Sequence, residues 1–381
     1  MSASLDEINQ KLDNPEASQT ISNADATNDI EETTMKPLTR IGRAVAAAAA
    51  RAVIYKSYGE PSRVLLMQYL SQAQAKAKLQ PHQILVKMKM SSINPSDLIP
   101  IRGAYHGRIQ LPCVPGYEGV GTVVESGSKV SDPPIGSRVL ALRGNGTWQD
   151  YVTMPAEEAV IVPPEINDDT AAQLYINPLT AWLMLTEELK LKQSSILAVN
   201  ACGSAFSNVL IQFSNILGYN IIGVVRSDFY TQRLLKAGVK YVINSAKEPL
   251  HESILSYTKG KGVDAALDAV GGEPGSELSK CVTKGGVMLH YGLLSGKPLP
   301  NEVFDFQKTG VTVKPFWLRE WVYQQKSDYR KKVFNTMIEI FVKHKIVLPT
   351  ERYFDLSQVC EAVTASEQPN RTGKVVLKHE K

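Results

Sequence analysis

The sequence predicts an α/β protein in which a β-rich domain is joined to a doubly wound parallel sheet, and three observations indicate this arrangement. Residues 52–164 contain short apolar and β-branched runs separated by Gly, Pro and polar turns, a pattern typical of a compact β domain. From residue 195 onward, apolar runs alternate with helix-patterned segments, which is typical of βαβ units. Residues 348–377 have the pattern of strand, helix and strand, so we expect the chain to return to its first domain.

Length and composition exclude several classes of protein. At 381 residues, of which 43% are hydrophobic and 21% charged, the chain is long enough for two domains. The formal net charge of +4 is small and the Lys and Arg residues are interspersed with acids, so we expect no nucleic-acid interface. No uncharged apolar run approaches about eighteen residues, so we expect no membrane span.

The cysteines point to a reducing compartment. Cys113, Cys202, Cys281 and Cys360 lie far apart and form no C-x-x-C pair. We therefore expect neither a disulfide framework nor a Cys-rich zinc lobe.

The first fifty residues differ from the rest of the chain. Residues 1–34 carry eight acids against one Lys and contain no aromatic residue, so we expect them to be disordered. From Met35 a basic, alanine-rich segment follows, which resembles an organellar presequence if translation begins at that Met. A surface helix or linker is the preferred interpretation. We therefore expect a cytoplasmic protein, with a mitochondrial location as the alternative.

The stretch from 195 to 228 has the order of one βαβ unit. An apolar run at 196–199 is followed by the turn NACGS, a helix pattern to residue 217, a turn at Gly218 and a strand at 221–225. A turn that leads into a helix N-terminus favours a phosphate, and Arg226 after the second strand suits the 2′-phosphate of NADPH. The usual G-x-G-x-x-G pattern is reduced to Gly203, so a βαβ unit without a nucleotide is an alternative.

Seven segments resemble the medium-chain dehydrogenase/reductase superfamily across residues 52–380: INPSDL, GYEGVGTVVESGSKV, GSRVLAL, INPLTAWLML, DAVGG, GGVMLHYG and RTGKVVL. The resemblance implies a GroES-like β-rich catalytic domain and a Rossmann cofactor domain, and it implies a homodimer. We expect an extension at 1–51, the first part of the catalytic domain at 52–176, the NADP-binding Rossmann domain at 177–315, and a return to the catalytic domain at 316–381.

Zinc-dependent members of the superfamily have a Cys and a His where this chain has INPSD and GYE. Glu118 is one carboxylate with no nearby His or Cys of suitable placement, so it cannot complete the three ligands of a catalytic zinc, and we expect no metal. Within the zinc-free branch, the chain resembles mitochondrial-type trans-2-enoyl thioester reductases in RGAY, GTW, NPLTAW, the NACGS turn, VVR and FWL. A quinone or other activated-alkene reductase, and a non-catalytic nucleotide-binding protein, are the alternatives.

This resemblance implies NADPH as the cofactor and an enoyl-CoA or an enoyl-acyl-carrier protein as the substrate. Tyr105 would donate a hydrogen bond to the enolate oxygen or a proton to carbon, and the Asn94 amide would fix the substrate or the nicotinamide. Trp148, Phe316 and Trp317 would shape the substrate pocket, while a turn role for Asn94 and core packing for Trp148 are alternatives. The cofactor-binding residues that the resemblance implies are Asn177, Thr180, Asn200, Gly203, Ser204, Ala205, Phe206, Arg226, Tyr291, Gly292, Phe316 and Trp317.

Overall fold

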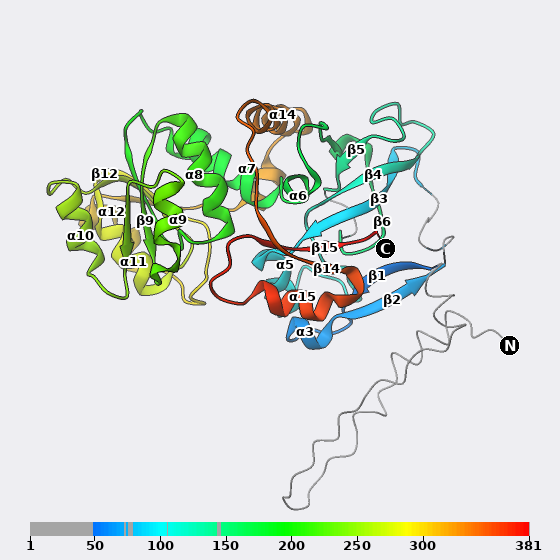
Figure 1. Cartoon of the computed structure of the whole chain (residues 1–381), viewed down its shortest axis with the longest axis horizontal. Helices are drawn as coiled ribbons and strands as arrows, with labels where there is room; N and C mark the ends of the chain where they lie inside the picture. The colour runs from blue at the N-terminus through cyan, green and yellow to red at the C-terminus, as the bar shows by residue number, and fades with distance from the viewer. Residues whose placement is uncertain (1–48, 72–73, 75–78, 105, 143–145, 381) are drawn as a thin grey trace, which may run out of the picture.

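The computed structural model describes residues 49–71, 74, 79–104, 106–142 and 146–380. These residues form two domains that lie side by side, with a parallel-sheet domain at one end of the molecule and a β-rich domain at the other (Figure 1). Most of the expected extension, at 1–48, and the predicted catalytic Tyr105 lie outside the described residues. The first strand begins at Ala50, two residues before the start that the sequence suggested for the β-rich domain.

The β-rich domain is built on a seven-stranded sheet in the order β14-β15-β3-β4-β5-β7, with β6 beside β3. Its strands are β3 (Gln83–Ser92), β4 (Gly119–Ser126), β5 (Arg138–Leu140), β6 (Tyr151–Pro155), β7 (Val160–Ile161), β14 (Thr350–Asp355) and β15 (Lys374–Lys378). An antiparallel pair, β1 (Ala50–Ile54) and β2 (Leu66–Leu70), belongs to the same domain. Its helices are α3 (Pro61–Val64), α5 (Pro95–Ile101) and α15 (Val359–Ser366), with short 3₁₀ turns at Ala156–Glu158 and Leu356–Gln358.

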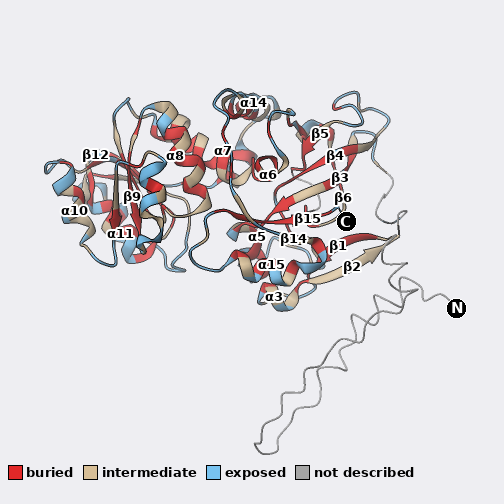
Figure 2. Ribbon diagram, in the orientation of Figure 1, coloured by how far each residue is buried: buried red, intermediate tan, exposed pale blue. Residues whose placement is uncertain are grey.

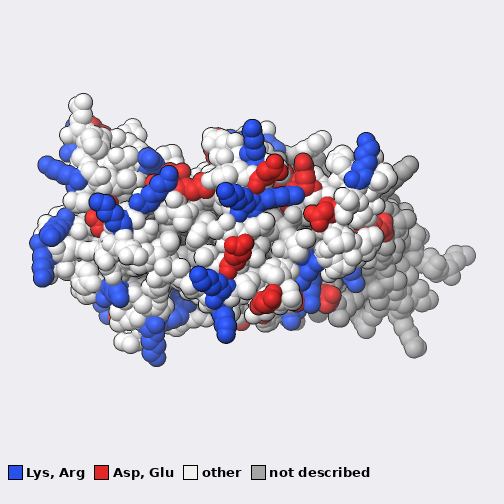
Figure 3. Space-filling view, turned by 90° about the horizontal axis from the view of Figure 1, so that it is seen from above, with Lys and Arg blue, Asp and Glu red and all other residues white. Residues whose placement is uncertain are grey.

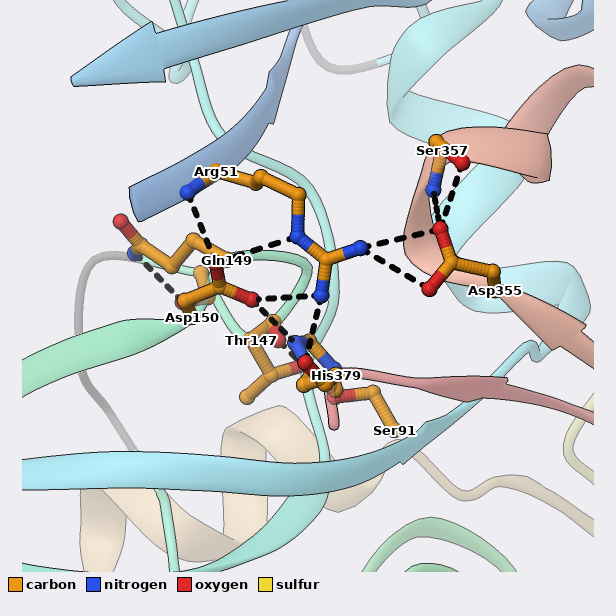
Figure 4. Close-up of polar contacts among 9 residues, drawn as sticks. Arg51, Ser91, Thr147, Gln149, Asp150, Asp355, Ser357 and His379 are labelled. Carbon is orange, nitrogen blue, oxygen red and sulfur yellow. Dashed lines mark hydrogen bonds and ion pairs between the residues drawn. The ribbon is translucent and has the colours of Figure 1, made fainter. Parts of the chain in front are cut away.

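The C-terminal strand brings the end of the chain back to its beginning. β15 pairs parallel with β14 and antiparallel with β3. Beside it, the buried Arg51 of β1 donates hydrogen bonds to both carboxylate oxygens of Asp355 at 2.9 Å, to Asp150 at 3.1 Å and to the backbone oxygen of His379 (Figure 4). The chain therefore leaves the β-rich domain and returns to it, as the sequence pattern predicts.

The second domain is a six-stranded parallel sheet in the order β10-β9-β8-β11-β12-β13. Its strands are β8 (Ile196–Val199), β9 (Asn220–Val225), β10 (Tyr241–Asn244), β11 (Val263–Asp268), β12 (Val282–His290) and β13 (Thr312–Pro315). Its helices are α8 (Ala205–Leu217), α9 (Thr231–Lys236), α10 (Leu250–Tyr257), α11 (Gly272–Lys280) and α12 (Phe306–Thr309), with 3₁₀ turns at Asp228–Tyr230 and Asn301–Phe304. The strand order reverses next to β8, which confirms the predicted doubly wound sheet, and ligands bind at the carboxyl ends of strands at such a point.

Further helices connect the two sheets. α6 (Asp168–Ala171) and α7 (Ile176–Leu183), continued by a π-helical segment at Met184–Leu189, precede β8, while α13 (Leu318–Gln324) and α14 (Ser327–Lys343) follow β13. Pro178 lies in the first turn of α7, where its missing N–H removes no helical hydrogen bond, so it does not break the helix. The ring of Phe341 in α14 lies 5.7 Å from that of Phe213 in α8. Arg330 of α14 also forms an ion pair with Glu158 of the β-rich domain, so α14 contacts both domains before the chain rejoins the β-rich sheet at β14.

Buried residues line both sheets and the helices between them (Figure 2). The largest apolar cluster runs from Val120 and Leu140 of the β-rich sheet through Leu179 of α7 to Phe341 of α14. A second cluster packs on the parallel sheet, and two more fill the β-rich domain. Full burial of one such side chain stabilises a fold by roughly 1.5–3 kcal/mol. Because the largest cluster contains residues of both domains, it also fixes the border between them.

Candidate cofactor site and active site

The turn between β8 and α8 forms the N-terminus of a thirteen-residue helix. The Ser204 side chain is the N-cap and accepts a hydrogen bond from the Ser207 N–H at 3.4 Å. The N–H groups of Ala205 and Phe206 follow in the first turn, where a helix provides no acceptor of its own. A Cβ at Gly203 would lie 2.7 Å from the ring of Tyr230, so no larger residue fits there. The turn thus keeps glycine where a side chain would meet the Tyr230 ring, and its N–H groups suit a phosphate.

Asn200 holds this turn in place. Its amide donates to Asp268 at the end of β11 at 2.5 Å, and its amide oxygen accepts from the Ala269 N–H at 2.8 Å. The side chain is 4% exposed. Of the predicted cofactor-binding residues, Asn200 is therefore the one whose side chain bonds inward to the neighbouring strand.

Asp268 is the centre of a polar network that the sequence did not reveal. Besides Asn200, it accepts hydrogen bonds from the backbone N–H groups of Val270 and Gly271, and it lies 2.6 Å from Nδ1 of His290. Burial acts to raise the pKa of this carboxyl, but the hydrogen bonds outweigh burial and hold the pKa below its ordinary value. The ends of β8, β11 and β12 are thus joined through one ionised carboxylate. The segment DAVGG contained the acid, but its partners are distant in sequence.

Aromatic residues close the same edge of the sheet. The rings of Phe206 and Tyr291 lie 4.6 Å apart, at an angle of 38°. The Tyr291 hydroxyl is buried with no hydrogen-bond partner among the described residues, and burial raises its pKa well above the ordinary value. A Cβ at Gly292 would lie 2.7 Å from the Ala269 carbonyl oxygen, so this approach requires glycine. The Phe316 N–H donates to the His290 carbonyl at 2.8 Å, which places Phe316 beside this pair.

Arg226 follows the last residue of β9 and is exposed. The nearby acid, Asp228, accepts a hydrogen bond from Asn244 at 2.6 Å and forms an ion pair with Lys247. The hydrogen bond from Lys247 is the main reason that the pKa of Asp228 is lowered. The negative charge next to Arg226 is therefore already paired, and the end of β9 presents a positive charge.

Arg233 of α9 is a second cation at this edge, and no motif in the sequence indicates it. Its guanidinium donates to the carbonyl oxygens of Gly203 at 3.0 Å and Thr372 at 2.8 Å. It also lies over the ring of Tyr230, 5.4 Å from the centroid. Arg233 therefore connects the turn between β8 and α8 to the segment that precedes β15. A helix position far from both partners gives no signal of this contact in the sequence.

On the β-rich side, the Asn94 amide is fully engaged. Its Nδ2 donates to Ser92 Oγ at 3.1 Å and to Glu118 Oε1 at 2.7 Å, and its Oδ1 accepts from the buried Lys374 ammonium. Asn94 also caps α5 and is 1% exposed. Both amide hydrogens thus bond within the protein, which favours the predicted turn role over contact with a substrate.

Glu118 links Asn94 to the helix that begins the cofactor domain. One carboxylate oxygen accepts from Asn94 and Ser92, and the other accepts from the N–H groups of Tyr175 at 3.1 Å and Ile176 at 2.8 Å. These N–H groups open α7, and a carboxylate at a helix N-terminus is stabilised by the helix dipole. α7 carries the predicted cofactor residues Asn177, which is half-buried, and Thr180, which is buried.

Two buried ionisable groups, Lys374 and Asp97, lie close to Asn94 and Glu118. Burial lowers the pKa of Lys374 to about 8, against the attraction of Glu118 and Asp97. Burial raises the pKa of Asp97 to about 7, with repulsion from Glu118 in the same direction. The Asp97 carboxylate accepts from the N–H groups of Asn94 at 2.7 Å and Tyr117 at 2.9 Å, which opposes the rise. Lys374 stood in the recognised segment RTGKVVL, but nothing in the sequence indicated its burial beside Asn94.

The predicted substrate residues lie in three different environments. Trp148 is fully buried with Tyr55, Leu98 and Ile101 in the β-rich core, which favours packing over contact with a substrate. Phe316 is 8% exposed and is therefore buried, whereas its neighbour Trp317 is 42% exposed and lies on the surface. Phe206, Tyr291 and Phe316 therefore all lie in or against the largest apolar cluster, whereas Trp148 lies in a cluster of the β-rich domain.

Two family models match the chain. One, described as an alcohol dehydrogenase GroES-like domain, matches residues 80–164, and the other, described as a zinc-binding dehydrogenase, matches residues 207–339. Human mitochondrial enoyl-[acyl-carrier-protein] reductase is 30% identical over 335 residues, which cover 87% of this chain and 89% of that protein. The chain belongs to the medium-chain dehydrogenase/reductase superfamily.

Solved structures agree with this membership of the medium-chain dehydrogenase/reductase superfamily. A putative NADPH:quinone reductase from Bacillus thuringiensis is 39% identical, with a TM-score of 0.82 over 87% of this chain and 99% of that one. A complex titled Etr1p/NADP/crotonyl-CoA is 25% identical, with a TM-score of 0.74 over 87% and 99% of the two chains.

Although one matching family model is described as zinc-binding, the described residues contain no group of three or more His, Cys, Asp or Glu side chains that could hold a metal ion. None of the helices in the described ranges is long and apolar enough to cross a bilayer.

Proposed function

We propose that this protein is an NADPH-dependent reductase of the carbon–carbon double bond of trans-2-enoyl thioesters. The observation that carries the proposal is the 335-residue match to enoyl-[acyl-carrier-protein] reductase, which spans both domains at 30% identity. The similarity to a protein titled as a complex with NADP and crotonyl-CoA supports the same chemistry. The substrate would be an enoyl-CoA or an enoyl group on an acyl carrier protein.

The carboxyl edge of the parallel sheet fits NADPH, which supplies the hydride when bound. The N–H groups of Ala205 and Phe206 would hold the diphosphate at the N-terminus of α8, where Gly203 leaves room for close approach. Arg226 would bind the 2′-phosphate through a charge-assisted hydrogen bond. The partnerless hydroxyl of Tyr291 supports a polar ligand at this edge, because a buried hydroxyl without a partner is costly.

The remaining predicted cofactor residues divide by position. Asn177 and Thr180 would lie beside the nicotinamide from α7, while Gly292 and Phe316 would border it from the ends of β12 and β13. Asn200 would act through the turn that it holds.

The chain must also manage the charge that develops on the substrate. Reduction at the β-carbon places negative charge on the thioester oxygen, and protonation at the α-carbon completes the reaction. We assign the hydrogen bond to that oxygen, or the proton to carbon, to Tyr105. Asn94 is proposed as a positioning residue, because its amide is held by Ser92, Glu118 and Lys374 at the start of α5, the helix that leads toward residue 105.

A quinone reductase is the second candidate. The Bacillus thuringiensis protein titled as a putative NADPH:quinone reductase is 39% identical, a higher identity than that of the enoyl reductase relatives. A mitochondrial location is the alternative to the cytoplasm, since the enoyl reductase relatives are named as mitochondrial. The homodimer stays a prediction that sedimentation can test.

An assay of NADPH oxidation tests the proposal directly. The substrates are crotonyl-CoA, a long-chain trans-2-enoyl-CoA and a quinone, and we expect the highest kcat/KM for one of the thioesters. Tyr105→Phe should lower kcat by roughly 10²–10⁴-fold, the usual contribution of a group that transfers a proton or stabilises charge.

Tyr257→Phe is the matched control, because Tyr257 lies on α10 and stacks on Tyr241 away from the site. Faster turnover of the quinone would replace the enoyl proposal with the second candidate. No binding of NADPH or NADH in a fluorescence titration would rule out both enzymes and leave a non-catalytic protein.

A further inference from the structure

A loop of three residues, Ala269, Val270 and Gly271, joins β11 to α11. All three of its N–H groups donate hydrogen bonds to side chains at the strand ends. The first donates to the amide oxygen of Asn200 at 2.8 Å, and the other two donate to the carboxylate of Asp268 at 3.0 and 3.1 Å. Asn200 and Asp268 are both buried. Two buried polar side chains therefore set the conformation of this β11–α11 loop.

The carbonyl groups of the β11–α11 loop also have partners. The Leu294 N–H donates to the first carbonyl at 3.0 Å, and the N–H and hydroxyl of Ser295 donate to the second at 3.0 and 2.7 Å. The third accepts from the Gly275 N–H of α11 at 3.2 Å. Because its N–H groups are all engaged inside the protein, the loop offers a ligand its shape and side chains rather than hydrogen-bond donors.

The carboxylate that holds the loop is itself held by His290. The Asp268 side chain is completely buried, and a Cβ at Gly275 would lie 2.6 Å from its Oδ2, so α11 packs directly on it. Its hydrogen bonds hold the pKa of Asp268 below the ordinary value, which keeps the carboxyl ionised. Nδ1 of His290 lies 2.6 Å from the same Oδ2. Because an ionised carboxylate only accepts hydrogen bonds, Nδ1 carries a proton and donates it.

The β11–α11 loop and Arg226 lie on opposite sides of β8, because the strand order is β10-β9-β8-β11-β12. A dinucleotide binds across the carboxyl ends of the strands where the order reverses, with its diphosphate at the N-terminus of the first helix. Arg226, at the end of β9, marks the adenosine side. The nicotinamide half of NADPH therefore lies over the ends of β11 and β12, on the side of the β11–α11 loop and His290.

Surface charge does not fix where the nicotinamide half binds. Figure 3 shows Lys and Arg side chains scattered over one face of the molecule and interspersed with Asp and Glu, rather than gathered in one patch. The adenosine half of NADPH carries the 2′-phosphate, whereas the nicotinamide ring and its ribose carry no phosphate besides the shared diphosphate. The fit of the nicotinamide half thus depends on the shape of the protein around it, to which the β11–α11 loop contributes.

We propose that His290 is a positioning residue for the nicotinamide half of NADPH and acts through Asp268 on the β11–α11 loop. The inference rests on NADPH as the cofactor and does not depend on which substrate is reduced. Loss of the Nδ1–H donor would leave the buried carboxylate short of one hydrogen bond, which is costly for a charged group. The loop that this carboxylate holds would then shift, while the adenosine side of the site would keep its shape.

The test measures dissociation constants by calorimetric titration with NADPH and with adenosine 2′,5′-bisphosphate, which contains only the adenosine half. His290→Leu keeps a side chain that branches at Cγ but removes the donor. It should raise the constant for NADPH roughly tenfold, as expected for loss of one hydrogen bond to a charged group, and leave that for the bisphosphate unchanged. His290→Asn places an amide N–H at the position of Nδ1 and should restore the wild-type constant for NADPH.

Hydrogen exchange provides a second measurement, without any ligand. The amides of Val270 and Gly271 donate to Asp268, so they should exchange faster in His290→Leu than in the wild-type protein and in His290→Asn. His344→Leu is the matched control, because His344 is exposed at the end of α14. This variant should change neither the exchange of the loop nor the binding of either ligand.

An unchanged constant for NADPH in His290→Leu would overturn the proposal. An equal rise for NADPH and the bisphosphate would also overturn it, because that result indicates a general loss of structure. If His290→Asn binds NADPH as weakly as His290→Leu, the Nδ1 donor is not what the site needs. Failure of the proposed enoyl reductase activity would leave these results unaffected, since no measurement in the series involves turnover.

Discussion

At the scale of single residues, the direction of each side chain decides its role. Arg226 follows a strand end that the apolar pattern located, so its exposed position at the sheet edge was predictable. Asn94 and Asn200 were predicted as ligand-binding residues, but both amides bond inward. Their partners Lys374 and Asp268 lie 280 and 68 positions away. Local patterns hold no information about such pairs, because only the fold brings them together.

Replacement of Arg226 by Gln should raise KM for NADPH at least roughly tenfold, because a charge-assisted hydrogen bond to the 2′-phosphate is lost. KM for NADH should not change. Steady-state kinetics with both nucleotides measures the effect, and Lys236→Gln, which removes an exposed charge from the neighbouring α9, is the control. If NADPH and NADH already bind the wild-type protein equally well, Arg226 is not a selector.

At the scale of elements, the start of α7 shows how a helix is tied to a distant strand. The sequence alone does not show whether Pro178 lies in the first turn of a helix or in its interior, where a proline would break it. The structure places the proline in that first turn, next to Tyr175 and Ile176, whose N–H groups donate hydrogen bonds to Glu118. One carboxylate thereby sets the position of a helix in the second domain relative to Asn94 in the first.

Glu118→Gln should weaken this connection. Glu118 accepts hydrogen bonds at both carboxylate oxygens, one from Asn94 and the other from the N–H groups of α7. The amide of Gln has only one oxygen, so its NH₂ group would face N–H donors on one of these two sides. We expect the free energy of unfolding to fall by about 3 kcal/mol, as for a broken buried charged network, and KM for NADPH to rise as α7 shifts. Urea unfolding and kinetics measure both effects.

Glu339→Gln, at an exposed position on α14, provides the control. A Glu118→Gln protein with wild-type stability and wild-type KM would show that the hydrogen bonds from the start of α7 to the Glu118 carboxylate do not set the position of the helix.

At the scale of the whole molecule, the alternation of apolar runs was enough to predict two domains and a return of the chain. It did not reveal that α14 contacts both domains, since an amphipathic pattern shows that a helix has a buried face without showing what covers it. The buried network around Arg51 was equally invisible (Figure 4). It joins residues from the beginning, middle and end of the chain.

His379, in that network, makes stability depend on pH. Its Nε2 lies 3.0 Å from Ser91 Oγ, while Nδ1 is 3.8 Å from Asp150, too far for a hydrogen bond. Burial lowers the pKa of His379 from 6.5 to about 3, and the charge of Arg51 adds to this, whereas Asp355 opposes it. The ring is therefore neutral in the folded state, while the unfolded chain takes up a proton below pH 6.5.

The stability that His379 contributes is consequently complete above pH 6.5 and is lost as the pH falls toward 3. We expect the wild-type free energy of unfolding to fall more steeply than that of His379→Gln in this range, by at most about 1.4 kcal/mol per pH unit. Urea unfolding between pH 6.5 and 4 measures the difference. The exposed His82→Gln is the control, and parallel curves for wild type and His379→Gln would contradict the assignment.

The bond from Arg51 to the carbonyl of His379 also has a consequence for synthesis on the ribosome. All six strands of the parallel sheet lie between residues 196 and 315, so they can assemble as one unit while later residues are still being made. The other sheet must wait, since β3 lacks its neighbour β15 and Arg51 lacks its last acceptor until residue 379 has left the exit tunnel. The β-rich sheet, which begins first along the chain, is thus completed after the parallel sheet, and loss of the segment that contains His379 would leave a buried arginine without one of its acceptors.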